Sequence, residues 1–367
     1  MSIPLFRPRI SEEAIAAAGE VLRSGWLGLG PRTEEFERRF AEYVGAPHCV
    51  GLSSCTAAIH LALHVLDLPE GTEVITTPIT FVSTNHAILY ERLVPVFADV
   101  DMHTGNITPD SIRSRLSEKT GAVIVVHYGG YPADLDEIYS IADEKGIAVI
   151  EDCAHAAGAE YRGRRIGSRG QLHAFSFHAV KNLPMGDGGA LTVASSELDA
   201  RLRRLRWLGI DKDTYRRTSD ARYEWEYDVA EVGFKYHMND IEAAIGIEQL
   251  RRLDVDNGRR RSIAEGYRAA LAGVAGLTLP PVSSDRSSSY HLFPILAERR
   301  NDFVQNLRDK GIATGVHYRR NDEYRMYEKA DLRGAEYFAS HVASLPMHLD
   351  LTDDDVGTIG DVIRAGW

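Results

Sequence analysis

The chain has 367 residues, of which 44% are hydrophobic and 26% are charged, and its formal net charge is −11. This length exceeds what one hydrophobic core usually holds, so we expect two domains of unequal size, and the composition excludes extended disorder. The acidic balance disfavours a general nucleic-acid-binding or membrane-binding surface, but it leaves room for a locally positive pocket that binds a small anion.

The cysteines and the N-terminal residues predict a soluble, cytoplasmic protein. The three cysteines form no Cys-x-x-Cys pair and no disulfide framework, which is typical of a reducing compartment. Residues 1–22 contain no apolar core followed by a small-residue cleavage site. No apolar run approaches the ~20 residues that a membrane-spanning helix needs.

From about residue 12 to 250, short β-branched runs alternate with helical patterns. The predicted buried strands are 48–52, 73–77, 94–98, 122–126 and 147–152. Helical stretches such as 56–66 and 134–146 separate several of them. Continuous apolar strands that alternate with helices predict a mostly parallel α/β sheet covered on both faces.

The last hundred or so residues change character. Residues 238–254 have a clear helical period and begin the predicted passage between the domains. After it, the pattern indicates a smaller α+β domain, with a helix at 301–311 and a late helix near the end. We therefore expect a large domain at 1–250, which includes the N-terminal segment, and a small domain at 251–367.

Lys181 follows an apolar, strand-like run and precedes a glycine-rich turn in "AFSFHAVKNLPMGDGGALT". Such a lysine has two interpretations. It either extends its charge out of a half-buried segment with no chemical role, or it is a nucleophile that forms a Schiff base with a carbonyl compound.

Other polar residues follow predicted strands, where ligands bind in a parallel sheet. Asp152 ends the strand "IAVIED"; alone it is more often a helix cap or a salt-bridge partner. His155 follows it, but no second cluster of metal ligands lies nearby, so we predict no metal site. Residues 53–56 place hydroxyls at a helix start, which suits either a phosphate site or local capping. Phe81 is either a core residue or a face on which a planar ring stacks.

Together these residues suit one ligand, pyridoxal 5'-phosphate (PLP). The lysine would hold the cofactor aldehyde and later move protons, and a carboxylate would keep the pyridine nitrogen protonated so that the ring acts as an electron sink. The two glycine-rich stretches, 25–36 and 186–192, do not follow a strand as Gly-x-Gly-x-x-Gly, so we reject a dinucleotide site.

Several blocks of the sequence resemble the DegT/DnrJ/EryC1/StrS family of PLP-dependent sugar aminotransferases. The blocks include "SSCTAAIHLAL", "TPITFVST", "IEDCAHAAGAEYRGRRIGSRG", "AFSFHAVKNLPMGDGGALT" and "EVGFKYHMNDIEAAIGIEQL". The resemblance implies a PLP-dependent transferase fold of type I, like that of aspartate aminotransferase. It also implies a homodimer with active sites at the subunit interface.

The resemblance assigns roles to the matching residues. It makes Lys181 the lysine that joins the cofactor, Asp152 the partner of the pyridine nitrogen, and Ser176 a phosphate ligand. Thr56, with the amide of Cys55, falls at the phosphate-binding turn, where the family usually has Gly-Thr.

Three more positions follow from the same resemblance. His155 stands where the family often has glutamine near the ring hydroxyl, and Phe81 matches the residue that packs against the pyridine ring. Lys235 falls where many members carry an asparagine that reaches the phosphate of the neighbouring subunit.

The substrate is predicted less closely than the cofactor. We expect an amino group to pass from L-glutamate to a keto group of a nucleotide-linked deoxysugar, with C4 favoured over C3. The alternatives are a cyclitol ketone, a dehydrating or aromatising reaction on the same fold, and a noncatalytic binding module.

After "GVHY" the family often continues with Pro-Leu-His, whereas this chain has "RRNDEYRMY", and residues 211–227 resemble a specificity loop. The predicted substrate residues are Trp26, His178, Arg216, Trp225, His317 and Tyr318. The basic residues expected near the phosphates of the acceptor are Lys212, Arg216, Arg217, Arg222, Arg319 and Arg320.

Overall fold

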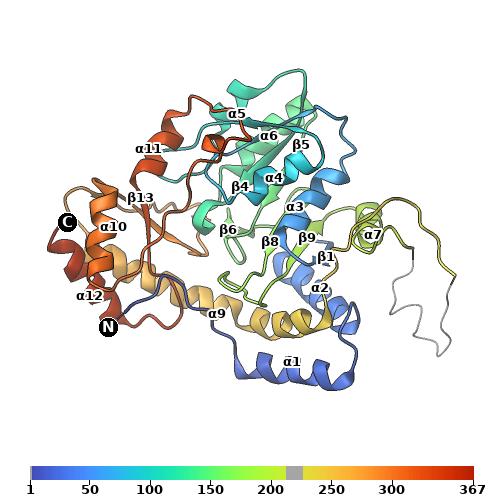
Figure 1. Cartoon of the computed structure of the whole chain (residues 1–367), viewed down its shortest axis with the longest axis horizontal. Helices are drawn as coiled ribbons and strands as arrows, with labels where there is room; N and C mark the ends of the chain where they lie inside the picture. The colour runs from blue at the N-terminus through green and yellow to red at the C-terminus, as the bar shows by residue number, and fades with distance from the viewer. Residues whose placement is uncertain (1, 212–225) are drawn as a thin grey trace.

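A computed structural model describes residues 2–211 and 226–367. In this part of the chain, the central sheet has seven strands in the order β1-β9-β8-β5-β4-β2-β3 (Figure 1). These strands are β1 (His48–Leu52), β2 (Glu73–Thr76), β3 (Val94–Phe97), β4 (Thr120–Val126), β5 (Ala148–Asp152), β8 (Leu172–Ser176) and β9 (Gly189–Val193).

The strand directions confirm the predicted mostly parallel sheet. Strands β3, β2, β4, β5 and β8 run parallel to one another. Strand β9 runs antiparallel to both β1 and β8, so β1 points the same way as β8. The carboxyl ends of β1, β2, β5 and β8 therefore meet at one edge of the sheet, where ligands bind in this class of fold.

Helices cover both faces of the sheet. The helices of this part are α1 (Glu12–Ser24), α2 (Pro31–Val44), α3 (Cys55–His64), α4 (Ser83–Tyr90), α5 (Pro109–Arg115), α6 (Leu135–Lys145) and α7 (Ser196–Leu205), with a short 3-10 turn η1 (Tyr128–Gly130). Along β4, Val123 and Val125 join the core under α2 and α6, whereas Ala122 and Ile124 join the core under α3 and α7. This alternation places one apolar set on each face, as the pleat of a strand requires.

The C-terminal part adds a smaller sheet and its own core. Its strands are β10 (Leu277–Thr278), β12 (Phe293–Ala297) and β13 (Val342–Leu345), and β12 runs antiparallel to both neighbours. Its other elements are α10 (Arg300–Asp309), η2 (Asn321–Glu323), α11 (Arg333–His341) and α12 (Asp353–Arg364). A third small sheet joins β11 (Arg286–Ser287) to β6 (Glu160–Tyr161) and β7 (Arg164–Arg165).

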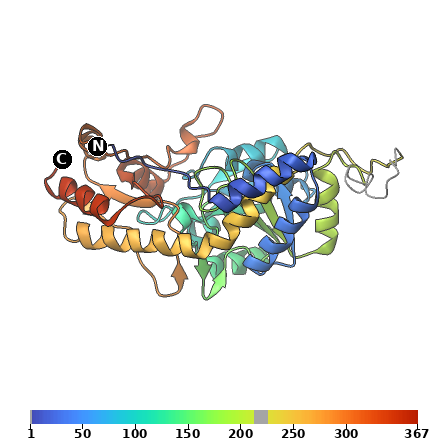
Figure 2. The ribbon, with the colours of Figure 1, turned by 90° about the horizontal axis from the view of Figure 1, so that it is seen from below.

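Helix α9 (Asp240–Leu271) runs as one long helix from beneath the central sheet to the C-terminal part (Figure 2). It begins at Asn239, whose side chain accepts a hydrogen bond from the Glu242 N–H (3.0 Å). The N-terminal segment also reaches the C-terminal part, because Ile3 pairs with Ile312 and is buried in the same core. The domain boundary at residue 250 thus falls inside a continuous helix and stays a prediction.

Within the described residues, no helix is both long enough and apolar enough to cross a membrane.

Candidate active site

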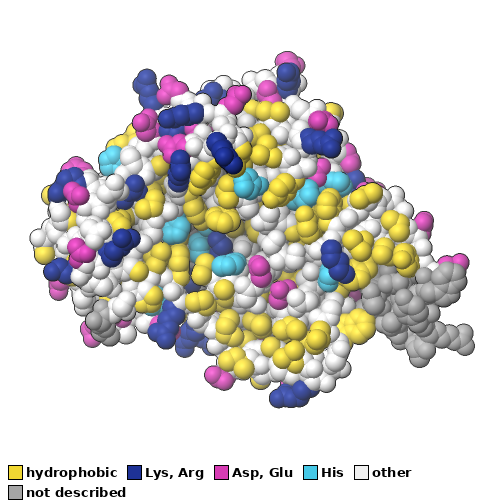
Figure 3. Space-filling model, viewed as in Figure 1, with side chains coloured by type: hydrophobic (Ala, Val, Ile, Leu, Met, Phe, Trp, Pro, Cys, Tyr) yellow, Lys and Arg dark blue, Asp and Glu magenta, His cyan; other side chains and the backbone are white. Residues whose placement is uncertain are grey.

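A cavity of about 400 Å³ lies at the edge where the carboxyl ends of the strands meet. On the face drawn in Figure 3, histidine side chains and hydrophobic side chains gather around a hollow near its centre. Ten of the residues predicted from the sequence line the cavity: Cys55, Thr56, Phe81, Asp152, His155, Ser176, His178, Lys181, His317 and Tyr318. They come from four strand ends and from the C-terminal part, so the fold gathers residues that are far apart in the sequence.

Lys181 extends into this cavity from the turn that follows β8. Burial lowers the pKa of Lys181 to about 8, against the opposing effect of Cys55 and Asp152, which favour the charged form. Its Nζ lies 3.5 Å from His291 Nε2. A lysine that keeps its amine in the protein interior, with a pKa lowered toward neutrality, suits a nucleophile better than a side chain reaching for solvent.

Asp152 is the last residue of β5 and is 4% exposed. The Thr84 hydroxyl donates to Oδ2 (2.8 Å) and the Ala154 N–H donates to Oδ1 (3.1 Å). Burial raises the pKa of Asp152, although both hydrogen bonds oppose this change. Among the described residues, no cation lies within ion-pair distance of this carboxylate, and Lys181 and His127 favour its charged form only from farther away. A protonated ring nitrogen is the kind of partner that a buried carboxylate needs.

The start of α3 lies beside Asp152 and has the features that an anion site requires. The Ser54 hydroxyl accepts a hydrogen bond from the Ala57 N–H (3.1 Å) and caps the helix, while Cys55 and Thr56 in its first turn face the cavity. First-turn N–H groups have no acceptor within a helix and attract phosphate. Gly189 lies so close behind this turn that an added Cβ would be 2.3 Å from the Ser54 carbonyl carbon. Ser176, at the end of β8, lines the same side of the cavity.

Phe6 and His291 are among the lining residues that sequence reasoning missed. The Phe6 ring stacks on His291 with centroids 5.7 Å apart, and His291 lies 4.4 Å from the His155 ring. On the other side of His155, Tyr318 stacks at 6.2 Å, and its hydroxyl lies 3.1 Å from His155 Nε2. No local pattern in the sequence marks Phe6 or His291 as site residues.

The other predicted site residues lie elsewhere. Lys235 is outside the cavity lining, and its Nζ lies 3.2 Å from the centroid of the Trp207 ring. Trp26 is also outside the lining, and its Nε1 donates to the Leu29 carbonyl (3.1 Å). Arg216 and Trp225 fall outside the described residues, as do Lys212, Arg217 and Arg222.

The expectation that Arg320 binds a phosphate of the substrate is wrong. Arg320 is 4% exposed and donates to both carboxylate oxygens of Asp322 and to the Ala330 carbonyl. The charge of Arg320 is therefore neutralised by Asp322 inside the fold and is not directed at a substrate. Arg319 is exposed and forms an ion pair with Glu323 (3.3 Å).

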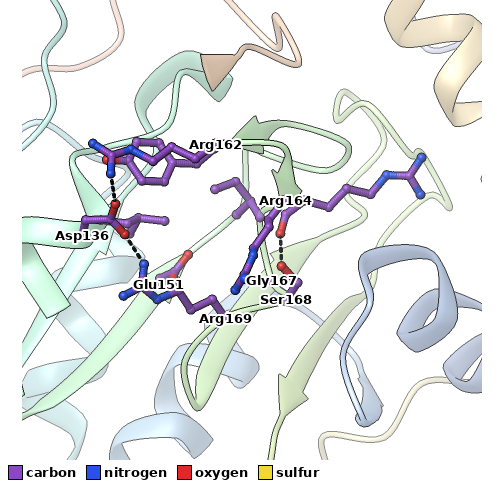
Figure 4. Close-up of a pocket in the computed structure, with 11 residues that line it drawn as sticks. Asp136, Glu151, Arg162, Arg164, Gly167, Ser168 and Arg169 are labelled. Carbon is purple, nitrogen blue, oxygen red and sulfur yellow. Dashed lines mark hydrogen bonds and ion pairs between the residues drawn. The ribbon is translucent and has the colours of Figure 1, made fainter. Parts of the chain in front are cut away.

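A second cavity, of about 470 Å³, is lined by four arginines but holds no comparable chemistry. Asp136 lies between Arg162 and Arg169 and pairs with both (Figure 4). The Glu151 carboxylate is also buried there and is held by His127 (2.9 Å) and Tyr139. Because these carboxylates already have partners, the cavity around Lys181 is the better candidate.

Comparison with known proteins provides independent information on this chain. The sequence matches the DegT/DnrJ/EryC1/StrS aminotransferase family over residues 8–364. It is 38% identical over 375 residues to the spore coat polysaccharide biosynthesis protein SpsC of Bacillus subtilis, covering 99% of this chain and 96% of SpsC. The crystal structure of the sugar aminotransferase CalS13 from Micromonospora echinospora superimposes with a TM-score of 0.93 at 36% identity, covering 100% of each chain. The PLP form of Spr1654 from Streptococcus pneumoniae has a TM-score of 0.92 at 30% identity, covering 100% of this chain and 98% of that one.

Proposed function

Because the chain belongs to the DegT/DnrJ/EryC1/StrS aminotransferase family and is a PLP-dependent aminotransferase, we propose that it transfers an amino group from L-glutamate to a keto group of a nucleotide-linked deoxysugar, with C4 favoured over C3. The observation that carries the proposal is the buried amine of Lys181 in one cavity with the unpaired carboxylate of Asp152.

The residues around this cavity fit PLP. The first turn of α3, with Cys55 and Thr56, and the Ser176 hydroxyl would hold the phosphate, because they offer N–H and O–H donors on one side of the cavity. Asp152 would face the pyridine nitrogen, and Phe81 would pack on the ring. When bound, the cofactor supplies an electron sink for the charge that develops on the substrate carbon.

The chain's own groups then position reactants and move protons. The Asp152 carboxylate would hold a proton at the ring nitrogen, since the buried negative charge favours a cation beside it. Lys181 Nζ would take the proton from the amino-bearing carbon of the donor and pass it to the cofactor carbon. In the second half of the cycle it would move a proton from that carbon to the former keto carbon of the acceptor. Its pKa of about 8 suits both directions, because a group with a pKa near the working pH can accept and release a proton.

The acceptor is proposed from charge and from the relatives. Lys181 is the one lysine or arginine among the described residues that line the cavity, so a nucleotide diphosphate needs cations from outside this lining. The basic residues within 212–225 are candidates from the sequence. A sugar acceptor agrees with the name of CalS13, a sugar aminotransferase, and with that of SpsC, a polysaccharide biosynthesis protein.

The active unit is proposed to be a homodimer. Lys235 lies outside the cavity of its own chain, which fits a role at the phosphate site of a second copy. Large apolar side chains near it in the sequence are exposed, including Val229 (52%) and Val232 (85%). Burying them against a second copy would remove an exposed apolar patch.

The test of the acceptor is a two-step reaction with the purified holoenzyme. L-glutamate alone should change the cofactor absorbance, and the excess donor is then removed. A panel of nucleotide-linked 4-keto sugars, 3-keto sugars and cyclitol ketones is offered, and the true acceptor restores the original spectrum. Restoration by an unphosphorylated cyclitol ketone alone would contradict the nucleotide-sugar proposal, whereas no response to glutamate would contradict the donor.

A further inference from the structure

His291 contacts the amine on which the proposed function depends. It lies just before β12, is 2% exposed, and places its Nε2 3.5 Å from Lys181 Nζ. Within the described chain, Lys181 forms no ion pair with a carboxylate, so His291 is its polar side-chain contact.

The backbone on either side of His291 is fixed to the 3-10 turn η1. The N–H groups of Ser289 and Leu292 donate to the carbonyls of Gly130 and Gly129, both at 3.2 Å. An added Cβ at Gly130 would lie 2.2 Å from the Ser289 hydroxyl, so this close approach requires glycine. The rings of Phe6 and His155 then pack against the imidazole and restrict its rotation.

Three other histidines line the cavity, and two of them, His155 and His317, already have hydrogen-bond partners for their rings. The Gly129 N–H donates to His155 Nδ1 (3.2 Å), so the proton of this neutral ring is on Nε2, which donates to the Tyr318 hydroxyl (3.1 Å). His317 Nδ1 lies 2.9 Å from the Ser344 hydroxyl. The third, His178, accepts at Nδ1 from the Val180 N–H (3.5 Å). Among the described residues, His291 is therefore the imidazole within hydrogen-bond distance of Lys181 Nζ.

The protonation of Lys181 determines which nitrogen of His291 carries the proton. At neutral pH an unliganded Lys181 with a pKa of about 8 is mostly an ammonium group, which has three donors and no acceptor. A hydrogen bond to His291 Nε2 then requires a lone pair on that atom. The single proton of the neutral ring must be on Nδ1, the atom for which the structure provides no partner among the described residues.

We propose that His291 is a positioning residue for Lys181: its neutral ring, protonated on Nδ1, accepts a hydrogen bond at Nε2 from Lys181 Nζ and aims the amine into the cavity. This inference deepens the proposed function and rests on Lys181 being the reacting amine. His291 is given no contact with substrate.

Other charged and titratable groups lie around this pair and also influence the pKa values of Lys181 and His291. Around Lys181 these are Cys55, Asp152, His155 and His317. Around His291 they are Lys181, His155, His317 and Arg260 of α9. Burial, together with Lys181 and His155, lowers the pKa of His291 well below its usual range, which keeps the imidazole neutral.

The test compares two substitutions that separate hydrogen bonding from ring packing. His291→Phe keeps a ring between Phe6 and His155 but removes the acceptor, whereas His291→Gln loses the ring but keeps an amide oxygen within similar reach. The pKa of Lys181 is measured in the apoenzyme from the pH dependence of its acetylation by acetic anhydride, with the Lys181 peptide quantified by mass spectrometry. His341→Gln, a change on α11 outside the cavity, is the control.

A neutral acceptor stabilises the ammonium form, so its removal should lower the pKa. We expect the Lys181 pKa to fall by about one pH unit in His291→Phe and to stay within about 0.3 of the wild type in His291→Gln. The rate of the glutamate half-reaction in the holoenzyme should fall about tenfold in the first variant and less than about threefold in the second. A pure packing role predicts the reverse order, with Phe close to wild type, and that result would overturn the proposal.

A measurement on the unchanged protein covers the case in which His291→Phe does not fold. Nitrogen NMR of the histidine-labelled apoenzyme near pH 7, with His291 identified by its loss in His291→Gln, should show a proton on Nδ1. A proton on Nε2 at this pH would contradict the proposal. Neither readout depends on the sugar substrate, so an error in the proposed acceptor leaves this test intact.

Discussion

Lys181 and Asp152 are both held away from their ordinary pKa values, in opposite directions and for one reason. Burial disfavours the charged form of each, so the lysine pKa falls to about 8 and the aspartate pKa rises. In the described structure neither group has an ion-pair partner, and their favourable effect on each other does not offset the cost of burial. A ligand that brings both a cationic ring nitrogen and a carbonyl for the amine would relieve both costs, which supports the proposed placement of PLP at this site.

The pKa of Lys181 predicts how the stability of the apoprotein changes with pH. Its folded value of about 8 lies below the ordinary value of 10.5. Between these values the unfolded chain binds more protons than the folded chain, so the free energy of unfolding rises with pH. The destabilisation caused by burying the charged lysine is fully present only below pH 8. Relative to Lys181→Met, which cannot titrate, the wild-type free energy of unfolding should increase by about 1–3 kcal/mol from about pH 7.5 to about pH 10. Urea unfolding of both proteins checks this, and parallel pH curves would contradict it.

Removing the charge of Asp152 should separate cofactor binding from catalysis. Asp152→Asn can still accept the Thr84 hydrogen bond, but it cannot hold a proton on the ring nitrogen. We expect the variant to retain PLP and to lose about 100-fold or more in turnover. Thr84→Val, which leaves the carboxylate in place, should lose much less. Stopped-flow absorbance of the glutamate half-reaction measures both, and a loss below about tenfold in Asp152→Asn would show that another group protonates the ring.

At the scale of elements, the five strands expected from apolar runs correspond to β1 to β5 with small shifts at their ends. Buried parallel strands are continuous in sequence, so local pattern is sufficient to find them. The pattern gave no sign of β9, whose place between β1 and β8 depends on pairing with distant segments. The same limit applies to the site: Asp152, Ser176 and Thr56 follow strand ends, whereas Phe6 and His291 reach the cavity through long-range packing that no local pattern encodes.

The close packing of β9 against the start of α3 can be tested at Gly189. An alanine Cβ there would overlap the Ser54 backbone, so Gly189→Ala should displace the proposed phosphate turn. We expect a loss of about 1–3 kcal/mol in the free energy of unfolding, together with weaker PLP retention. Gly357→Ala in α12 is the control, because nothing lies within 4 Å of its added Cβ and alanine favours a helix. Differential scanning calorimetry and dialysis against PLP-free buffer give the two readouts; unchanged PLP retention would separate the turn from phosphate binding.

At the scale of the whole molecule, the two ends of the chain and the long helix α9 join the parts that form the cavity. Helix α9 packs in the core below the central sheet and in the C-terminal core. Phe6 comes from the N-terminal segment, and His317 and Tyr318 come from the C-terminal part. The complete wall therefore requires nearly the full chain.

Whether it also requires a second chain is tested by mixing two inactive variants. Lys181→Ala removes the reacting amine, and Lys235→Glu should repel the phosphate held by the partner. In a mixed dimer with shared sites, one of the two sites carries neither substitution. A 1:1 mixture that exchanges freely should reach about a quarter of wild-type activity, because half of the dimers are mixed and each has one intact site. Native mass spectrometry confirms the exchange, and mixed dimers without activity would contradict the shared site.

The N-terminal segment also has a consequence for folding during synthesis. Ile3 finds its partner at Ile312, and the Leu5 carbonyl accepts a hydrogen bond from the Met347 N–H (3.1 Å). At about 5–20 residues per second, the ribosome adds residue 312 roughly 15–60 s after residue 3. For that time Ile3 has no native partner, and Phe6 has no His291 on which to stack until residue 291 has been added. A chain still being translated, or one cut short before residue 312, would therefore hold the strand ends of the cavity without its closing wall, and we expect cofactor loading to occur only after synthesis is nearly complete.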